Sequence, residues 1–340
     1  MYHKVDVEQA VGMVLGHDIT QILPNRFKGP ALKKGHIIQQ SDIPLLLSMG
    51  KQQVYVLHLG EGYVHEDEAA RRIATAAAGT HLSLGSPSEG KINLIADVAG
   101  LLTINTQLLD QINALPDVML ATIHSQQMVS QGQSVAGTRI IPLVVPQDCL
   151  RQVEAICAQQ SVVDIQTLKA AKVGLITTGS EVYNGLIEDG FAPVVRRKFE
   201  QLGSTIVEQV LVSDELDMTI EAIFQLLEQG ADFIALTGGM SVDPDDQTPA
   251  AIRASGAEVV TYGAPVLPGA MFMLAWLNGV PIVGLPGCVM YYQASIFDLV
   301  VPRLLAGEQV TDKEIRSLAH GGMCMSCPTC RFPLCGFGKG

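Results

Sequence analysis

The sequence predicts an α/β domain in the second half of the chain and a mainly β or mixed region before it. From Lys172 onward, continuous apolar strands alternate with helices, an order typical of a parallel sheet covered on both faces. Residues 1–150 instead alternate short apolar runs with Gly, Pro and Asn breaks, which indicates short strands and turns. We therefore expect an accessory region at 1–160, a three-layer α/β/α domain at 161–310 and a Cys-rich tail at 311–340.

In the accessory region the clearest signals are helical. Segment 41–49 begins with Ser and Asp, which can cap a helix, and the Ala- and Arg-rich segment 66–78 is followed by a glycine stop. Segment 52–59 (QQVYVLHL) has the pattern of a strand, and 147–160 is again helical. We place the boundary with the next domain near Ser161.

The α/β domain is expected to contain four strands and four helices in strict alternation. The strands are predicted at 172–179, 204–212, 231–239 and 280–287. The helices are predicted at 194–202, 215–229, 248–254 and 291–305. Asp214 is expected to cap the second helix, and Pro249 suits the first turn of the third.

Composition and charge exclude several functional classes. Hydrophobic residues make up 48% of the chain and charged residues 16%, which is typical of a globular protein. The net charge of −12 and the lack of a basic cluster argue against nucleic-acid binding. No apolar run approaches the length of a membrane span, and the start of the chain lacks a signal-peptide pattern. We expect a cytoplasmic protein without nucleic-acid or membrane partners.

Three of the predicted strands end in glycine-rich polar loops. These are TTGSE at 177–181, TGGMSVDPDDQTP at 237–249 and GLPG at 284–287. In open α/β sheets the carboxyl ends of parallel strands share one edge, where ligands bind. Glycines let the backbone approach a ligand and leave amide groups free to hold anions such as phosphate. The three loops therefore predict one binding rim.

These loops resemble the signatures of a known family. TGSE at 178–181 and GLIED at 185–189 resemble the TGxE and GxIxD motifs of molybdopterin molybdotransferases, including the matching domain of gephyrin. TGGMSV at 237–242 resembles another motif of that family, and DQTP at 246–249 is closer to the DxTP of molybdopterin adenylyltransferases. LPG at 285–287 matches the start of the motif LPGNP. Residues 172–307 thus resemble a molybdopterin-binding domain.

The resemblance implies a role in biosynthesis, maturation or delivery of the molybdenum or tungsten cofactor. It implies that molybdopterin or its nucleotide adduct contacts Thr178, Gly179, Ser180, Glu181, Thr237, Gly238, Gly239, Met240, Ser241, Asp245, Thr248, Pro286 and Gly287. If the protein is an enzyme, it would transfer a nucleotidyl or metal-oxo group with Mg²⁺, using Asp246 and Asp214. A molybdoenzyme client and a homo-oligomer are further expectations.

Departures from the family pattern keep other functions open. The lysine-bearing PGKP segment of molybdotransferases is replaced here by 268–271 (PGAM), which has no lysine. The Asn of LPGNP is Cys288, and the Asn after GxIxD is Phe191. These changes favour a non-catalytic carrier, chaperone or sensor as a competing hypothesis. A third is a nucleotide pyrophosphatase of the competence-damage type, which has a similar loop pattern.

The tail contains four cysteines with the spacing of a metal site. They are Cys324, Cys327, Cys330 and Cys335, in the pattern C-x2-C-x2-C-x4-C. A tail too small for its own core can be organised by structural zinc or by an iron–sulfur cluster. The two successive x2 intervals resemble the start of the bacterial ferredoxin run and favour the cluster, while unliganded thiols remain an alternative.

Overall fold

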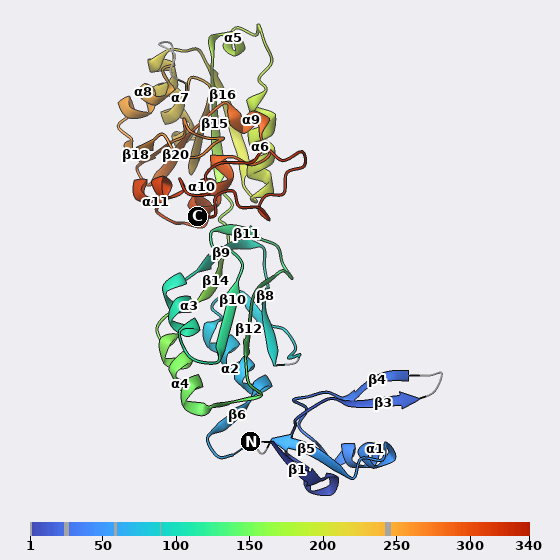
Figure 1. The fold of residues 1–340 in the computed structure, drawn as a ribbon. Coiled ribbons are helices and arrows are strands. Elements are labelled where there is room, and N and C mark those ends of the chain that lie inside the picture. The colour runs from blue at the N-terminus through green and yellow to red at the C-terminus, as the bar shows by residue number, and fades with distance from the viewer. Residues whose placement is uncertain (1, 24–26, 58–59, 89, 242–245) are drawn as a thin grey trace. The chain divides into compact units, whose positions relative to one another are not determined.

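The computed structural model describes residues 2–23, 27–57, 60–88, 90–241 and 246–340 (Figure 1). Contacts divide the chain into two compact units, 1–123 with 129–165, and 124–128 with 166–340. We call them the N-terminal unit and the α/β unit. Among the described residues, no helix is long and apolar enough to cross a membrane.

The N-terminal unit is built mainly from short antiparallel strands. Its strands are β1 (Tyr2–Asp6), β2 (Val14–Leu15), β3 (Ile19–Leu23), β4 (Phe27–Leu32), β5 (Gln53–Leu57), β6 (Tyr63–His65), β7 (Leu82–Leu84), β8 (Lys91–Ala96), β9 (Gly100–Ile104), β10 (Val118–Thr122), β12 (Ser134–Ile140), β13 (Val144–Pro146) and β14 (Val163–Gln166), whose last residue is counted with the α/β unit. Strand β11 (Gln127–Val129) has its first two residues in the α/β unit and its last in the N-terminal unit. Its α-helices are α1 (Ile43–Ser48), α2 (Glu66–Ala77), α3 (Thr106–Asn113) and α4 (Gln147–Ile156).

Three of these helices and strand β5 lie where the sequence predicts them. Helix α2 begins after His65, whose Nδ1 accepts a hydrogen bond from the backbone of Asp67 at 3.3 Å. Its buried face is alanine-rich and packs on β8 and β12, because small side chains allow a helix to approach a sheet closely.

The strand predicted at 52–59 corresponds to β5, and its last two residues, 58–59, lie outside the described residues.

The α/β unit contains one six-stranded sheet in the order β16-β15-β17-β20-β19-β18. The strands are β15 (Lys172–Thr178), β16 (Thr205–Val212), β17 (Phe233–Thr237), β18 (Glu258–Tyr262), β19 (Met273–Leu277) and β20 (Val280–Leu285). The helices are α5 (Ser180–Tyr183), α6 (Phe191–Gln201), α7 (Leu216–Glu228), α8 (Thr248–Ala254), α9 (Cys288–Tyr291), α10 (Ile296–Leu305) and α11 (Asp312–Ser317).

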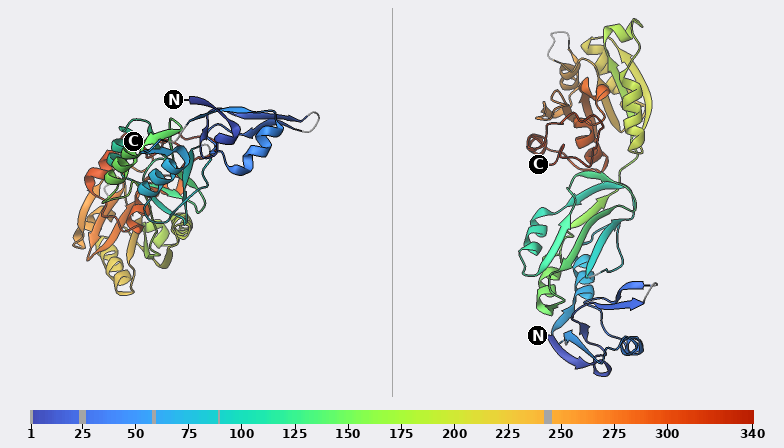
Figure 2. Two further views of the ribbon diagram at one scale, coloured as in Figure 1. Left: turned by 90° about the horizontal axis from the view of Figure 1, so that it is seen from below. Right: turned by 45° about the vertical axis from the view of Figure 1, so that its right-hand side comes forward.

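Helices cover both faces of this sheet, as the sequence predicts for a three-layer domain (Figure 2). Strand β15 alternates between two cores: Leu175 packs with Phe199 of α6 and Val300 of α10, whereas Ile176 packs with Leu226 of α7. Both faces of the strand are buried, so its sequence is a continuous apolar run.

The expectation of an all-parallel sheet is wrong at one edge. Strands β16, β15, β17 and β20 are parallel, but β19 is antiparallel to β20 and to β18. The turn between β19 and β20 is Asn278-Gly279, and both residues have positive φ, 52° and 81°. This is the turn chemistry of a two-residue hairpin, a signal that the prediction overlooked.

The predicted helix 291–305 is also interrupted. Helix α9 ends at Tyr291, and α10 begins only at Ile296. The hydroxyl of Ser295 and the carboxylate of Asp298 form a capping box, which fixes the start of α10.

The tail packs against the α/β unit instead of standing apart from it. Phe337 is 4% exposed within the core under α6 and α10. Upstream, the backbone N–H of Leu267 donates to Gly322 O and that of Cys324 donates to Leu267 O, both at 2.8 Å. The Cys-rich segment is therefore anchored at both of its ends.

Candidate functional site

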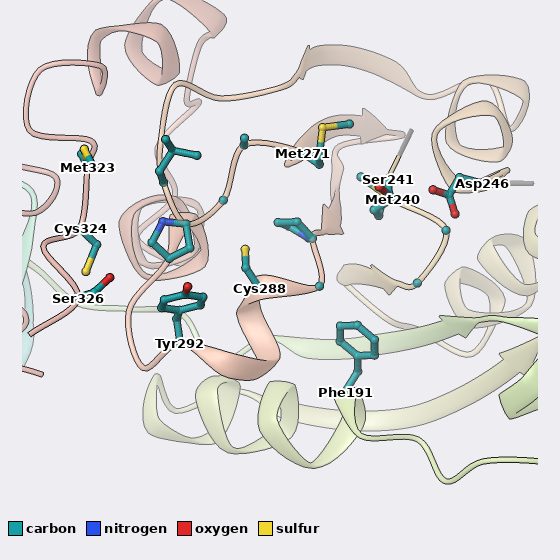
Figure 3. Close-up of a pocket in the computed structure, with 18 residues that line it drawn as sticks. Phe191, Met240, Ser241, Asp246, Met271, Cys288, Tyr292, Met323, Cys324 and Ser326 are labelled. Atoms are coloured by element: carbon teal, nitrogen blue, oxygen red, sulfur yellow. The ribbon is translucent and has the colours of Figure 1, made fainter. Parts of the chain in front are cut away.

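A cavity of about 670 Å³ opens at the carboxyl ends of β17 and β20 (Figure 3). We call it the rim cavity. Its lining comes from 238–241 with Asp246 after β17, 267–271 before β19, 286–288 after β20, Phe191, Tyr292, and Met323, Cys324 and Ser326 of the tail. Figure 3 shows Asp246 and Ser241 at one end of the cavity and Cys324 and Ser326 at the other. Two of the three predicted loops thus meet at one site.

The two glycines after β17 make this convergence possible. Gly238 has φ 82°, and a Cβ there would stand 2.0 Å from the carbonyl oxygen of Thr178. Gly239 has φ 55°, and its Cβ would stand 2.7 Å from the hydroxyl of Thr248. Any side chain would combine a left-handed backbone with a steric clash, so only glycine fits either position.

Three predicted binding threonines join the loops from inside. The Thr178 hydroxyl lies 3.1 Å from the Thr248 hydroxyl and 3.3 Å from the Thr237 carbonyl oxygen. Thr248 in turn donates to the carbonyl oxygen of Gly238 at 2.9 Å. All three residues are buried and none lines the rim cavity. Their hydroxyls shape the loops, and their contact with a ligand stays a prediction.

Asp214 braces the first loop and does not cap the next helix. Its Oδ2 accepts hydrogen bonds from the backbone N–H and the hydroxyl of Ser180, at 2.8 and 2.9 Å. The N-cap of α7 is Glu215, without a side-chain hydrogen bond, so the predicted cap is wrong. The carboxylate satisfies the exposed amide at the start of α5 instead.

One of the two predicted catalytic carboxylates lines the rim cavity and the other does not. Asp246 lines the rim cavity, whereas Asp214 and segment 178–181, including the exposed Glu181, are absent from its lining. Asp245 lies outside the described residues. Pro286, Gly287, Met240 and Ser241 are at the cavity as predicted.

Sequence reasoning missed the structural role of Asp189. One carboxylate oxygen accepts from the backbone N–H groups of Phe191 and Ala192, at 2.8 and 3.2 Å, and so starts α6. The other accepts from the hydroxyl of Thr177 at 3.0 Å and from the amide of Gln209 at 2.6 Å. Helix α6 therefore begins three residues earlier than predicted and presents Phe191 to the cavity. An Asp two residues before a helical pattern is the signal that could have revealed this start.

Comparison with known proteins relates most of the α/β unit to a known family. Residues 174–306 match the family model described as probable molybdopterin binding domain. This segment is therefore similar to the molybdopterin-binding domains that the model describes. Residues 4–58 match a family described only as a domain of unknown function.

The curated relatives match only part of the chain. Molybdopterin molybdenumtransferase of Bacillus subtilis is 29% identical over 212 residues, which cover 54% of this chain and 47% of the relative. The Staphylococcus aureus protein of the same name is 30% identical over 140 residues, covering 39% of this chain and 33% of the relative. The chain thus spans a third to about half the length of these proteins.

Solved structures resemble the chain over a similar stretch. A tungsten cofactor synthesizing protein from Pyrococcus furiosus has 22% identity and a TM-score of 0.31, covering 36% of this chain and 84% of that one. A molybdopterin biosynthesis enzyme from Thermus thermophilus has 20% identity and a TM-score of 0.33, covering 41% of this chain and 98% of that one.

The rim cavity is rich in sulfur, and the described part of its lining has no basic side chain. Among the described residues, no Lys or Arg lines it, and Ala270 stands where the PGKP pattern has lysine. Met240, Met271, Cys288, Met323 and Cys324 contribute sulfur to the lining. Burial raises the pKa of the Cys288 thiol, so this group is neutral at pH 7.

The predicted metal sites do not appear as tight groups of ligands. Within the part of the chain that the structure describes, no three His, Cys, Asp or Glu side chains are close enough together to hold one ion. Cys324 and Cys335 are half-buried, and Cys327 and Cys330 are exposed. All four line a second cavity, of about 450 Å³, which we call the tail cavity.

Proposed function

We propose that this protein binds molybdopterin or its nucleotide adduct in the rim cavity and acts in maturation or delivery of the molybdenum or tungsten cofactor. The observation that carries the proposal is the meeting of two glycine-rich strand ends on one cavity, within a segment that matches the model of a probable molybdopterin binding domain. The volume suits a ligand of nucleotide or pterin size, since such sites commonly span about 300–1,000 Å³.

The lining offers chemistry for both parts of such a ligand. The backbone N–H groups of residues 238–241 and of Gly287 can contact a phosphate closely, because glycine has no side chain to cover them. Phe191 and Tyr292 line the same cavity and offer aromatic faces for a planar ring (Figure 3). We infer that the backbone loops hold the phosphate end and the aromatic side chains hold the pterin.

Pterin binding and molybdate insertion are separate parts of the expected function. No Lys or Arg is among the described residues of the lining, so a molybdate anion there would be held by the backbone amides of the glycine-rich loops. Among the described residues, Asp246 is the only one of the predicted Mg²⁺ ligands in this lining, because Asp214 is bonded to Ser180 and is absent from it. A non-catalytic carrier or sensor is the alternative to the biosynthetic role, and a turnover assay separates the two.

Some expectations about the protein's surroundings remain predictions. They are a molybdoenzyme client, a homo-oligomer, a cytoplasmic location and a metal at the tail cysteines. Transfer of a nucleotidyl group is a further prediction.

Retention of pterin during purification tests the proposal. The protein is expressed in a host that makes molybdopterin, and bound pterin is measured by the fluorescence of its oxidised form. Gly287→Leu would fill the cavity without backbone strain, since its φ is −52° and a Cβ would meet only Phe191 at 3.8 Å. We expect a loss of at least about tenfold in affinity, equivalent to roughly 1.4 kcal/mol.

Gly60→Leu is the matched control, because a Cβ there would meet only Tyr63, at 3.9 Å. A wild-type protein that retains no pterin, or equal retention by both variants, would refute binding at this site. Incubation with adenylylated molybdopterin, Mg²⁺ and molybdate then separates carrier from enzyme. Turnover would refute the carrier form of the proposal.

A further inference from the structure

The four tail cysteines surround one cavity although they are far from forming a compact ion site. Cys324, Cys327, Cys330 and Cys335 all line the tail cavity of about 450 Å³. Cys324 and Cys335 also pack against the core of the α/β unit, and Cys327 and Cys330 are exposed. The four cysteines thus share one partly open cavity.

A single zinc ion does not fit this arrangement. Zinc holds four thiolate sulfurs about 2.3 Å from one point, which places them roughly 3.8 Å from one another. Among the described residues no three potential ligands come together in this way. The cavity also has room for many atoms, since one water molecule occupies only about 30 Å³.

An iron–sulfur cluster would use the four cysteines differently, because it is larger than a single ion. Its iron and sulfide atoms stand between the cysteinyl sulfurs, so the cysteines surround the cluster at a distance from one another. Phe332 and Phe337 also line the cavity, with ring centroids 6.1 Å apart, and shield part of it from water. Solvent exposure is one of the properties that tune such clusters.

The tail cavity shares a wall with the rim cavity. Tyr292, Met323, Cys324 and Ser326 line both. Cys324 is held in this wall by the hydrogen bond from its backbone N–H to Leu267 O, at 2.8 Å. Leu267 itself lines the rim cavity. An occupant coordinated by Cys324 would therefore immobilise one end of the rim cavity.

We propose that the tail cavity holds an iron–sulfur cluster bound by these four cysteines, and that the cluster fixes the wall shared with the rim cavity. Each thiol loses its proton when it binds iron, and the proposal includes no redox step. The claim about the shared wall rests on the proposed pterin binding. The claim that the tail cavity holds a cluster does not depend on it.

Iron and acid-labile sulfide measure the site directly. The full chain is purified without oxygen, or reconstituted with ferric iron, sulfide and a thiol reductant, and its visible and electron paramagnetic resonance spectra are recorded. We expect iron and sulfide in equal amounts. The double variant Cys327→Ser/Cys330→Ser should lose both, while its exposed positions leave the fold intact, as circular dichroism can check.

Cys149→Ser/Cys157→Ser is the matched control, because both thiols belong to the N-terminal unit. It should keep the wild-type content of iron and sulfide. Zinc in place of iron, absence of both metals after reconstitution, or iron that survives in the tail variant would each overturn the cluster.

Pterin affinity tests the shared wall. Loss of the cluster in the tail variant should weaken pterin binding several-fold, whereas Gly287→Leu should lose pterin and keep iron and sulfide. Unchanged pterin affinity after loss of the cluster would refute the shared wall. A wild-type protein with iron and sulfide but no pterin affinity would refute the proposed function and the shared wall, and would leave the cluster site supported.

Discussion

The rim cavity and the tail cavity are neighbours, but they are built in different ways. The rim loops follow buried strands and are joined by buried threonines and by glycines that tolerate no side chain. The tail is short and has no sheet of its own, so its shape depends on Phe337 at one end and on backbone hydrogen bonds to Leu267 at the other. The loops that carry the family motifs are therefore held in place by the fold itself. The tail instead depends on its packing contacts or on a bound ligand for its shape.

The largest effect is expected at an ion pair beside the tail cavity. Lys198 is 7% exposed and binds both carboxylate oxygens of Asp298, at 2.8 and 2.9 Å, and Gln293 O at 2.8 Å. Lys198→Met would leave Asp298 buried without its cation, and we expect a loss of about 3–5 kcal/mol in unfolding free energy. Denaturant titration measures this loss.

Adding Asp298→Asn to Lys198→Met provides the control for that experiment. The double variant should recover part of the lost stability, because no uncompensated charge remains. A single variant as stable as the wild type would show that the pair does not support this part of the molecule.

Gly238→Ala should damage the rim specifically. The added Cβ would stand 2.0 Å from Thr178 O at a φ of 82°, so we expect a cost of about 3 kcal/mol, from a strained backbone and a displaced loop. Gly203→Ala is the matched control, since its φ is 77° but nothing lies within 4 Å. It should cost about 1 kcal/mol. Equal thermal stabilities of the two variants would contradict the close packing of the loops.

Phe337→Ala should release the tail with a smaller effect on the whole domain. Truncating a buried Phe typically costs about 3–5 kcal/mol, but a segment near the chain end can detach locally, so we expect about 2 kcal/mol or less globally. Faster hydrogen exchange at 322–336 should accompany it. Unchanged exchange there would show that Phe337 does not anchor the tail.

Sequence patterns predicted the strands and glycine-rich loops of the rim cavity better than the contacts that hold those loops in place. Buried parallel strands are continuous apolar runs, so β15, β17 and β20 and the glycines after them could be located. The bracing roles of Asp214 and Asp189 could not, because short loops let either carboxylate reach several backbone amides. The pairing of Leu267 with Met323 in a short parallel β-bridge could not be predicted either. It depends on how the tail packs against residues far away in the sequence.

The smallest effect is expected in the reactivity of thiols at the two cavities. Cys288 is half-buried in the rim, and burial raises the pKa of its thiol, so little thiolate forms at pH 7. Alkylation followed by peptide mass spectrometry should label the exposed Cys327 and Cys330 of the metal-free protein first. The rate at Cys288 should rise as the pH approaches its raised pKa, because the thiolate is the reactive form. If Cys288 reacts as fast as Cys327 at pH 7, the rim is open to solvent and the distinction between a preformed rim and a loosely held tail fails.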